Sequence, residues 1–447
     1  MPAIITNAFR TYNADNFIGS FSSNKVYLMI GKATPWSGAD LGQYTQGSPS
    51  DTAIPSPIDT TVAPFIHHND MIAAKLINVS DVSHVVKRVD WTSGTVYTEY
   101  DHKQDDQIDQ TFFVMTDQYN VYKCISNYGG ATSTVKPIGQ TSSIIEMSDN
   151  YRWKFMYEVQ QADVLKYVTT DWIPIKYLSL DDGTTQWDVQ QAAVDGALEH
   201  IDVTAGGTGY VNTNTGTAQV GSIATTIKLA ATASATDDIY NTMTVYISSG
   251  TGSGQIKTIT DYVGSTKIAT VSTWTTTPDA TSVYEIMPAV AISHGSELPV
   301  PGVLATARVS SVIGGIIKKV TMTTVGTLYR SGTATVTGGG GTNCTLEPRI
   351  GPKGGHGKNP KTELGGAYVM INIRLIGTEG GDFVVGDDFR KVILITNPLV
   401  SGAAASATTY TGAELDDDSG EQIYIEYRAP INRASDQTED VKLVVEF

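Results

Sequence analysis

The fold of this chain is decided by three runs near its C-terminal end: Lys391-Val-Ile-Leu-Ile-Thr396, Gln422-Ile-Tyr-Ile-Glu-Tyr-Arg428 and Val441-Lys-Leu-Val-Val-Glu-Phe447. The first run is continuously apolar, as in a strand that is buried on both faces. The other two alternate, which places these apolar residues on one face of each strand: Ile423, Ile425 and Tyr427, and then Val441, Leu443, Val445 and Phe447. The three runs predict a sheet that closes a scaffold, with the end of the chain hydrogen-bonded into it.

The composition favours strands over helices. The 447 residues exceed one typical domain, so we expect two or three. Apolar residues make up 40%, enough for cores, and Thr, Ser, Val, Gly and Tyr are plentiful, whereas Leu is not. These residue types are favoured in strands and turns. We therefore predict a mainly β fold: a β-sandwich built from N- and C-terminal segments, with a nested all-β insertion and few short helices.

The charge balance argues against binding to nucleic acid or to an anionic membrane. Thirty Lys and Arg stand against forty-six Asp and Glu, which gives a formal net charge of −16. Non-specific binding to phosphates requires clustered cations, and no Lys/Arg run offsets the excess of acid. We expect neither nucleic acid nor membrane among the partners.

The cysteines and the apolar runs indicate a soluble protein made in a reducing cytoplasm. Cys124 and Cys344 stand far apart in unrelated contexts, so we expect two buried thiols rather than a disulfide or a zinc site. The first residues lack the basic start and long apolar core of a signal peptide. No apolar run approaches the ~18 residues of a membrane-spanning helix.

Two short helices are expected in an otherwise strand-like chain. An Asn or Asp cap at residue 69 or 70 precedes Met71-Ile-Ala-Ala-Lys-Leu76, which predicts a helix as far as Ile77. A second helix is predicted from Ala162 to Val168. Apolar and alternating runs predict strands at Val26–Ile30 and Asn120–Ile125, among others.

The middle of the chain has a different texture and an internal repeat. From about residue 199 to 345 it is rich in Thr, Gly, Ser and Val. Ile201-Asp-Val203…Gly207-Thr-Gly-Tyr210…Thr217-Ala-Gln-Val220 recurs as Val320-Thr-Met322…Gly326-Thr-Leu-Tyr329…Thr333-Ala-Thr-Val336, about 119 positions later. The pattern is strand, glycine turn, Tyr, strand, and Gly supplies the positive φ of a tight turn. Two such copies can pair within one β-unit.

This texture predicts three parts in the chain. They are residues 1–198 (main fold, N-terminal part), 199–345 (an inserted β-domain, in which repeat strands 199–220 and 317–345 frame a nested module, 221–290) and 346–447 (main fold, C-terminal part).

No sequence pattern predicts a metal or cofactor site. None of the seven histidines has H-E-x-x-H spacing, and His67 and His68 would face opposite sides of a strand. Gly354-Gly-His356-Gly lacks the P-loop pattern and a following helix, which favours a purely conformational loop. Asp416-Asp-Asp418-Ser-Gly-Glu421 departs from the calcium-loop pattern and is more typical of a solvated turn. We expect no cofactor and no metal.

Several main-fold segments resemble a known family. The matching elements include Phe9-Arg10, Gly31-Lys-Ala-Thr-Pro35-Trp36-Ser37, Arg88-Val-Asp90-Trp91, Val121-Tyr-Lys-Cys124, Tyr151-Arg-Trp153…Glu158, Asp388-Phe-Arg390, Ile395-Thr-Asn-Pro-Leu399, Ser419-Gly-Glu-Gln-Ile-Tyr424 and Asp436-Gln-Thr-Glu439. In this order they are similar to the baseplate wedge subunit of T-even-like contractile-tail bacteriophages, the homodimeric wedge protein. The resemblance covers roughly residues 5–195 and 345–447, and the centre of the remaining block resembles a small β-module of phage structural proteins.

The resemblance implies a structural protein of the virion and no catalytic residues. It implies a subunit in the tail baseplate, assembled in the host cytoplasm, that dimerises with itself and connects other wedge proteins of the same phage. The residues expected to define the fold or an interface are Pro35, Trp36, Trp91, Trp153, Asn397, Pro398, Tyr424, Arg428 and Gln437.

Two other functions remain as alternatives. The first is a receptor- or glycan-binding tail protein that acts through the inserted β-domain, with Tyr246, Trp274 and Tyr284 as its aromatic residues. The second is a polysaccharide-degrading enzyme, which rests only on scattered carboxylates, because their separation is a three-dimensional quantity.

Overall fold

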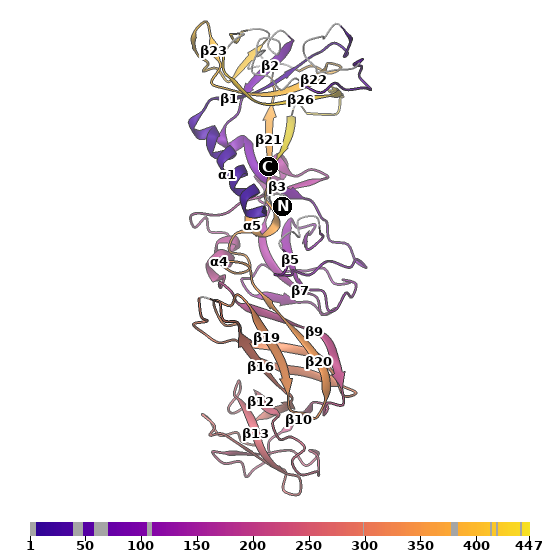
Figure 1. Ribbon diagram of the computed structural model, residues 1–447, viewed down its shortest axis with the longest axis vertical. Helices are drawn as coiled ribbons and strands as arrows, with labels where there is room; N and C mark the ends of the chain where they lie inside the picture. The colour runs from indigo at the N-terminus through magenta and orange to yellow at the C-terminus, as the bar shows by residue number, and fades with distance from the viewer. Residues whose placement is uncertain are drawn as a thin grey trace. The chain divides into compact units, whose positions relative to one another are not determined.

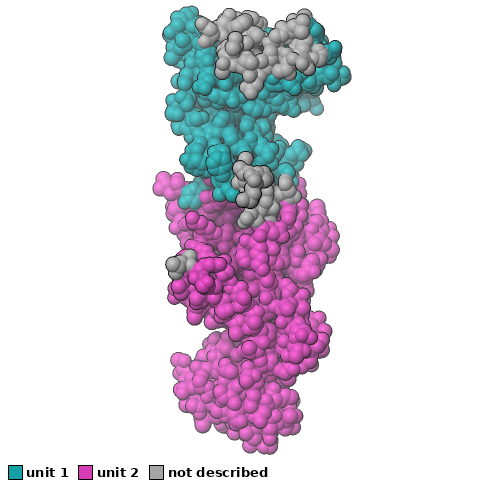
Figure 2. Space-filling model, viewed as in Figure 1, with its two compact units in different colours: residues 1–88, 159–177, 364–447 teal, residues 89–158, 178–363 magenta. Residues whose placement is uncertain are grey.

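The protein is mainly β, as predicted. A computed structural model describes residues 6–38, 48–57, 70–104, 110–297, 299–376, 383–411, 414–416, 419–438 and 440–447. The chain divides into two compact units (Figure 2). Unit 1 comprises residues 1–88, 159–177 and 364–447, and unit 2 comprises residues 89–158 and 178–363. Both units therefore combine segments that are far apart in the sequence.

Unit 1 contains two antiparallel sheets (Figure 1). The five-stranded sheet has the order β25 (Thr409–Thr411), β2 (Met71–Leu76), β1 (Val26–Gly31), β22 (Asp388–Thr396) and β26 (Glu421–Asn432). The four-stranded sheet has the order β27 (Asp440–Glu446), β21 (Tyr368–Arg374), β3 (Val82–Lys87) and β8 (Trp172–Ile175). The remaining elements are α1 (Asn7–Ser23), η2 (Val79–Asp81), α3 (Gln161–Tyr167), β23 (Leu399–Val400) and β24 (Ala403–Ala404).

The core of unit 1 lies between its two sheets. All six residues of β1 are buried, because alternate side chains enter two different clusters. Val26 and Leu28 join the cluster that Ile371 and Leu443 of the four-stranded sheet complete. Tyr27 and Met29, on the other face of β1, pack in a second cluster. The continuous apolar pattern of β1 and β22 follows from burial on both faces.

The three C-terminal runs are strands, but they do not form one sheet. β22 and β26 pair with each other in the five-stranded sheet. β27 pairs with β21 in the four-stranded sheet, where Phe447 N donates to Ala367 O at 3.1 Å. The expectation of a single sheet is therefore wrong, although the end of the chain is hydrogen-bonded as predicted. Alternation determines which face of a strand is apolar, but it does not determine which sheet the strand joins.

The expected helices are only half correct. α3 lies where the second helix was predicted. Met71–Leu76, expected as a helix, is β2, which pairs with β1 on one side and β25 on the other; Asn69 lies outside the described residues. Tertiary pairing overrides the helix propensity of its Ala, Lys and Leu residues. The longest helix, α1, was not predicted; Thr6 caps it by accepting from Phe9 N at 3.3 Å.

Unit 2 contains three antiparallel sheets. The four-stranded sheet has the order β4 (Phe113–Met115), β5 (Asn120–Ser126), β7 (Arg152–Glu158) and β6 (Ile144–Glu146). The second sheet runs β18 (Ile316–Thr324), β17 (Thr306–Ile313), β16 (Ala289–His294), β19 (Gly332–Thr337), β20 (Thr342–Ile350) and β9 (Leu198–Thr208). The third runs β10 (Asn214–Thr217), β15 (Val283–Met287), β12 (Thr244–Ser249), β13 (Ile256–Val263), β14 (Ile268–Val271) and β11 (Thr226–Lys228). Two short helices complete the elements, α4 (Thr185–Ala192) and α5 (Pro360–Leu364).

The internal repeat supplies β9, β18 and β19 of the second sheet, which curls so that its end strands β9 and β18 lie together. The second strand of the first copy is β10, which pairs with β15 in the third sheet, so the two copies do not lie wholly within one sheet as expected. In each copy a glycine with positive φ meets the ring of the Tyr that follows it by three residues. Gly207 has φ +62° and Gly326 has φ +68°; a Cβ at these positions would come within 2.9 Å of the Tyr210 ring and 2.7 Å of the Tyr329 ring, respectively. Only Gly fits both the backbone and the space.

Backbone hydrogen bonds also link the regions of the two copies. Tyr210 N donates to Gly315 O at 3.1 Å, and Tyr329 N donates to Gly196 O at 3.1 Å. In both cases the carbonyl belongs to the glycine five residues before the first residue of the other copy, as in a two-fold arrangement within one chain.

The third sheet has a core of its own. Trp274 and Tyr284 are buried in it together with Ile259 and Ile286. β11 to β15 lie within residues 221–290, the expected nested module, whereas β10 belongs to the stretch 199–220 that was expected to frame it. That residues 199–345 are an insertion into a shorter chain stays a prediction.

Candidate functional site

Trp36 is the centre of the predicted residues in unit 1. It is 3% exposed, and its indole Nε1 donates to the carbonyl of Arg428 at 3.1 Å. Its ring lies 4.7 Å from the ring of Tyr427, measured between centroids. Pro35 precedes it and fixes the backbone of the loop. The structure thus joins Trp36 to Arg428, two of the residues singled out from the sequence.

A cluster of ion pairs with buried cations next to Trp36 was not predicted. Arg390, which is 3% exposed, binds Asp51 and Asp388 at 2.8 Å each, and it holds the pKa of Asp51 below its usual value. Lys391 binds Asp70 at 2.8 Å, with its ammonium 5.9 Å from the centre of the Trp36 ring. The only sequence signal was a pair of cations at the head of an apolar strand.

The remaining predicted residues of unit 1 shape turns and strands. Tyr424 donates its hydroxyl to Glu426 at 2.8 Å; burial and this carboxylate raise the pKa of Tyr424. Asn397 has φ +49° and accepts from Lys25 N at 3.0 Å, which ties the end of β22 to the start of β1. Pro398 O accepts from Ala405 N, and Gln437 closes a turn by accepting from Ala434 N, both at 3.0 Å.

Trp91 and Trp153 belong to unit 2 and pack its four-stranded sheet. Trp91 Nε1 donates to Ser133 Oγ at 3.1 Å. Trp153 is fully buried and stacks on Tyr151 with 5.5 Å between centroids. Trp153 is a buried member of the hydrophobic cluster of this sheet, and Trp91 packs against the same cluster, which indicates a packing role.

The Gly354-Gly-His-Gly loop holds an anion, and the anion is a carboxylate of the chain itself. Glu363 accepts from Gly357 N at 3.0 Å and from Asn359 N at 3.1 Å. It also pairs with Lys123 at 3.0 Å; the two side chains are 3% and 0% exposed. The sequence suggested a purely conformational loop, and no motif predicted that the side chain of Glu363 would bind in it.

Further charges surround this pair. Lys123 of β5 lies directly opposite Lys154 of β7. Burial lowers the pKa of Lys123, raises that of Glu199 and lowers that of His356 well below its usual value, so that His356 is neutral. We call Lys123, Lys154, Glu199, His356 and Glu363 the closed centre.

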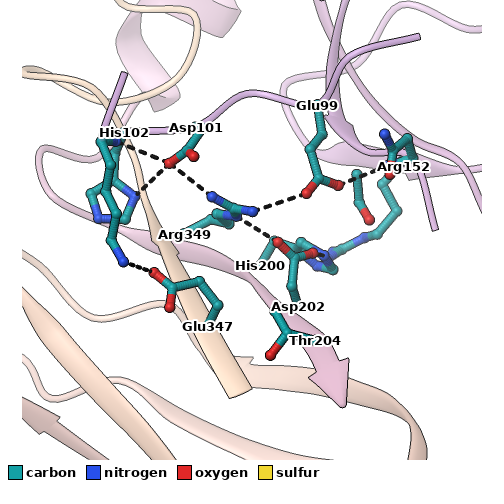
Figure 3. Close-up of polar contacts among 12 residues, drawn as sticks. Glu99, Asp101, His102, Arg152, His200, Asp202, Thr204, Glu347 and Arg349 are labelled. Carbon is teal, nitrogen blue, oxygen red and sulfur yellow. Dashed lines mark hydrogen bonds and ion pairs between the residues drawn. The ribbon is translucent and has the colours of Figure 1, made fainter. Parts of the chain in front are cut away.

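A second charged cluster of unit 2 centres on Arg349 (Figure 3). Its guanidinium binds Glu99 at 3.0 Å, Asp101 at 2.7 Å and Asp202 at 2.5 Å. Figure 3 shows the guanidinium between these carboxylates, with His200 next to Asp202 and Arg152 on the far side of His200. We call Glu99, Asp101, Arg152, His200, Asp202 and Arg349 the open centre.

The contacts of His200 fix its tautomer. Arg152 Nη1 lies 2.8 Å from His200 Nδ1, and Asp202 Oδ1 lies 2.5 Å from Nε2. Arg can only donate, so Nδ1 accepts and Nε2 carries the proton that Asp202 binds. Burial lowers the pKa of His200, in agreement with a neutral ring.

Two carboxyls of the open centre have pKa values far apart. Burial, and then the charge of Asp202, raise the pKa of Glu99 to about 7. Burial alone would raise the pKa of Asp202 as well. The hydrogen bonds and charges of His200 and Arg349 outweigh burial and lower the pKa of Asp202 to about 2. Near neutral pH Glu99 therefore carries the proton of this pair part of the time.

A cavity of about 450 Å³ adjoins the open centre. Its lining includes Glu99, Asp202 and Arg349, and also Tyr128 and Lys318. Sequence reasoning missed this site, because the distance in sequence from Glu99 to Arg349 is 250 positions.

The other patterns weighed from the sequence form no site in the described residues. Asp416 caps a turn by accepting from Ser401 N at 2.8 Å and Gly402 N at 2.7 Å. His67 and His68, together with Asp417 and Asp418, lie outside those residues. Among the described residues, no group of three or more His, Cys, Asp or Glu side chains is placed to hold a metal ion. Searching the same residues for a helix long and apolar enough to cross a membrane also finds none.

Comparison with known proteins gives one family. Residues 376–447 match the family model Phage-Gp8, described as Bacteriophage T4, Gp8. The matched segment contains β22, β26 and β27 and thus supplies strands to both sheets of unit 1. No curated protein gives a significant match. The match supports the resemblance found in the sequence, that of a T4-like baseplate wedge subunit.

Proposed function

We propose that the protein is a baseplate wedge subunit of a contractile phage tail, which dimerises and connects other wedge proteins and is not an enzyme. The observation that carries the proposal is the family match of residues 376–447. This segment is central to unit 1, because β22 and β27 bring their apolar faces into one core. The matched residues are therefore the framework of that unit.

The charged groups support a structural role over a catalytic one. Glu363, the carboxylate of the closed centre, is bound by Lys123 and two backbone N–H groups. Arg349 is occupied by three carboxylates. Such side chains have partners within the chain, which is what a rigid scaffold requires.

The place in the virion is tested on purified particles. Mass spectrometry of intact tails and a cryo-EM map of the baseplate should contain the chain, beside the other wedge proteins. A particle preparation of full infectivity without the chain would refute the proposal. Co-expression with the other wedge proteins of the phage should give a complex that survives size-exclusion chromatography.

The dimer is tested separately. Multi-angle light scattering of the full chain should give twice the mass of 47.8 kDa across a dilution series. A monomer at every concentration would count against the dimer and leave the place in the baseplate open to the particle experiment.

The inserted β-domain is part of the proposal as well. Leu198 and Ile350 are partners in the ladder between β9 and β20, so the ends of residues 199–345 are near each other and a short linker can replace the segment. We expect this deletion to leave a folded dimer, whereas removal of Val441–Phe447 takes away β27 and unfolds unit 1. Circular dichroism and light scattering of both variants test the division; the reverse result would refute it.

The alternative of glycan binding through the aromatic residues of that domain is not favoured. Trp274 is 4% exposed and Tyr284 is fully buried, and both pack in the core of their sheet. Tyr246 is partly buried, and the guanidinium of Arg308 covers its ring at 4.2 Å from the centroid. Their rings are therefore not available for stacking on a sugar.

A further inference from the structure

The seam between β9 and β18 is hydrogen-bonded at its ends, and the two strands also approach closely at Gly206, where a Cβ would come within 2.4 Å of Ile317 O. Leu198 N donates to Val325 O at 2.8 Å at one end, and Tyr210 N donates to Gly315 O at 3.1 Å at the other. Between these two bonds, no ladder joins β9 to β18 in the described residues. The cavity of about 450 Å³ lies here, lined by residues of both strands. Its size is that of pockets for small ligands.

The cavity lining has charges of both signs in fixed positions. Glu99 and Asp202 are held by the guanidinium of Arg349, whose side chain is 13% exposed. Towards the opening, Lys319 pairs with Glu146, and Lys318 has no ion-pair partner among the described residues. An anionic ligand would meet the carboxylates, and a cationic ligand would meet the guanidinium and ammonium groups. A neutral ligand that both donates and accepts suits this lining, and a hydroxyl group does both.

An aromatic side chain lies at the edge of the cavity in a strained conformation. Tyr128 has φ +53° and is 47% exposed. Asn127 fixes the turn: its side chain accepts from Gly130 N at 2.8 Å and donates to Tyr97 O at 3.1 Å. Asn127 N also donates to Glu99 at 3.1 Å, which couples the turn to the cavity. What distinguishes this exposed Tyr is its place in the cavity lining, where its ring is available to a ligand.

We propose that the β9–β18 seam binds a neutral saccharide of one or two rings, with Tyr128 against a ring face and with Glu99, Asp202 and Arg349 bonded to its hydroxyls. Apolar lining residues such as Val203 and Ile316 complete the contact with the C–H groups of the sugar. The proposal does not depend on the role in the baseplate, since it concerns only residues of unit 2.

The test measures binding of defined sugars to the full chain. The probes are glucose, galactose, N-acetylglucosamine and the disaccharides lactose, maltose and chitobiose, followed by isothermal titration calorimetry and saturation-transfer NMR. At least one probe should bind, and its affinity should change little with added NaCl, because no net charge is neutralised. Inorganic phosphate is the ionic probe and should not compete.

The decisive variant is Tyr128→Gly. Glycine prefers the positive φ found there, so the variant should fold as well as the parent while it loses the ring. Affinity for the bound probe should fall about tenfold, the usual scale for one aromatic contact. The matched control is Tyr119→Gly: Tyr119 is also exposed, at 39%, with φ +59°, but it is not part of the cavity lining, so binding should not change.

Three outcomes would overturn the proposal. The first is no binding by any probe at millimolar concentration, although thermal unfolding shows a folded protein. The second is equal affinity in Tyr128→Gly, Tyr119→Gly and the parent. The third is tight binding of phosphate that displaces the sugar, which would show an anion site instead.

Discussion

The closed and the open centre of unit 2 are made from the same chemistry. Each contains cations, carboxylates and a neutral histidine, His356 in one and His200 in the other. They differ in what covers them. In the closed centre the loop at 354–359 donates its N–H groups to Glu363 and leaves Lys123 with no exposed surface. In the open centre the charged groups line a cavity.

The difference shows that access to solvent decides what a cluster of charges can do. A fully buried ion pair has no substitute for a lost partner, so it serves as a structural tie. A pair at the wall of a cavity can exchange its contacts with water or ligand, so it can take part in binding. The two centres should therefore respond differently to the same kind of substitution.

The largest effect is expected for Glu363→Ala. The substitution leaves Lys123 buried without a counter-charge, and it leaves Gly357 N and Asn359 N without an acceptor. Breaking a buried pair in this way costs about 3–5 kcal/mol of the free energy of unfolding. Urea denaturation followed by Trp fluorescence measures the loss.

A double variant controls for volume and charge. Lys123→Met with Glu363→Gln removes both charges and keeps an acceptor for the loop, so it should cost only about 1–2 kcal/mol. If Glu363→Ala alone were as stable as the parent, the centre would not be closed.

The next effect is expected for Arg349→Met. It leaves Glu99, Asp101 and Asp202 facing one another without their common cation. We expect a loss of about 2–3 kcal/mol, less than in the closed centre, because water from the cavity can solvate the carboxylates. Arg349→Lys should recover only part, since an ammonium lacks the fork that three carboxylates share. A loss larger than that of Glu363→Ala would reverse the comparison.

The third effect is the pH dependence that Glu99 gives to the open centre. The pKa of Glu99 rises from its usual 4.5 to about 7 on folding. Between these values the folded state binds more protons than the unfolded state, so the free energy of unfolding falls as the pH rises through this window. The stabilisation is complete below 4.5 and is lost above 7.

Glu99→Gln tests this assignment. From about pH 5 to about pH 8 the parent should lose roughly 1–2 kcal/mol more than the variant, a figure reduced for the partial exposure of the carboxyl. Asp202 has the opposite sign but acts at lower pH, since its pKa is lowered to about 2. Urea midpoints at the two pH values give the measurement, and parallel curves for parent and variant would contradict it.

The fold was predictable where burial leaves a pattern in the sequence. β22 is apolar on both faces and β27 alternates, and both were found. α1 was missed because its buried positions include Thr11 and Ala14, which follow helical spacing but are not strongly apolar. β2 was taken for a helix because pairing with β1 and β25, and not local propensity, decides its state.

The two charged centres were not predictable, because their partners are far apart in the sequence. Lys123 and Glu363 are separated by 240 positions, and Glu99 and Arg349 by 250. No local spacing marks such pairs, whereas the predicted Trp36 stood out through its loop Pro. Strands can thus be predicted from periodicity, whereas contacts that depend on the topology of the fold cannot.

The smallest effect is expected at the outer edge of the cavity. Lys319 pairs with Glu146, and the two side chains are 36% and 39% exposed. Lys319→Ala should change the free energy of unfolding by less than about 0.5 kcal/mol, since water and salt already screen the pair. Lys136→Ala, which removes a comparable surface pair with Asp117, is the matched control and should likewise leave the free energy of unfolding nearly unchanged. If Lys319→Ala lowered the free energy of unfolding as much as Arg349→Met, the edge of the cavity would be as inaccessible to water as the closed centre. The distinction between the two centres would then fail.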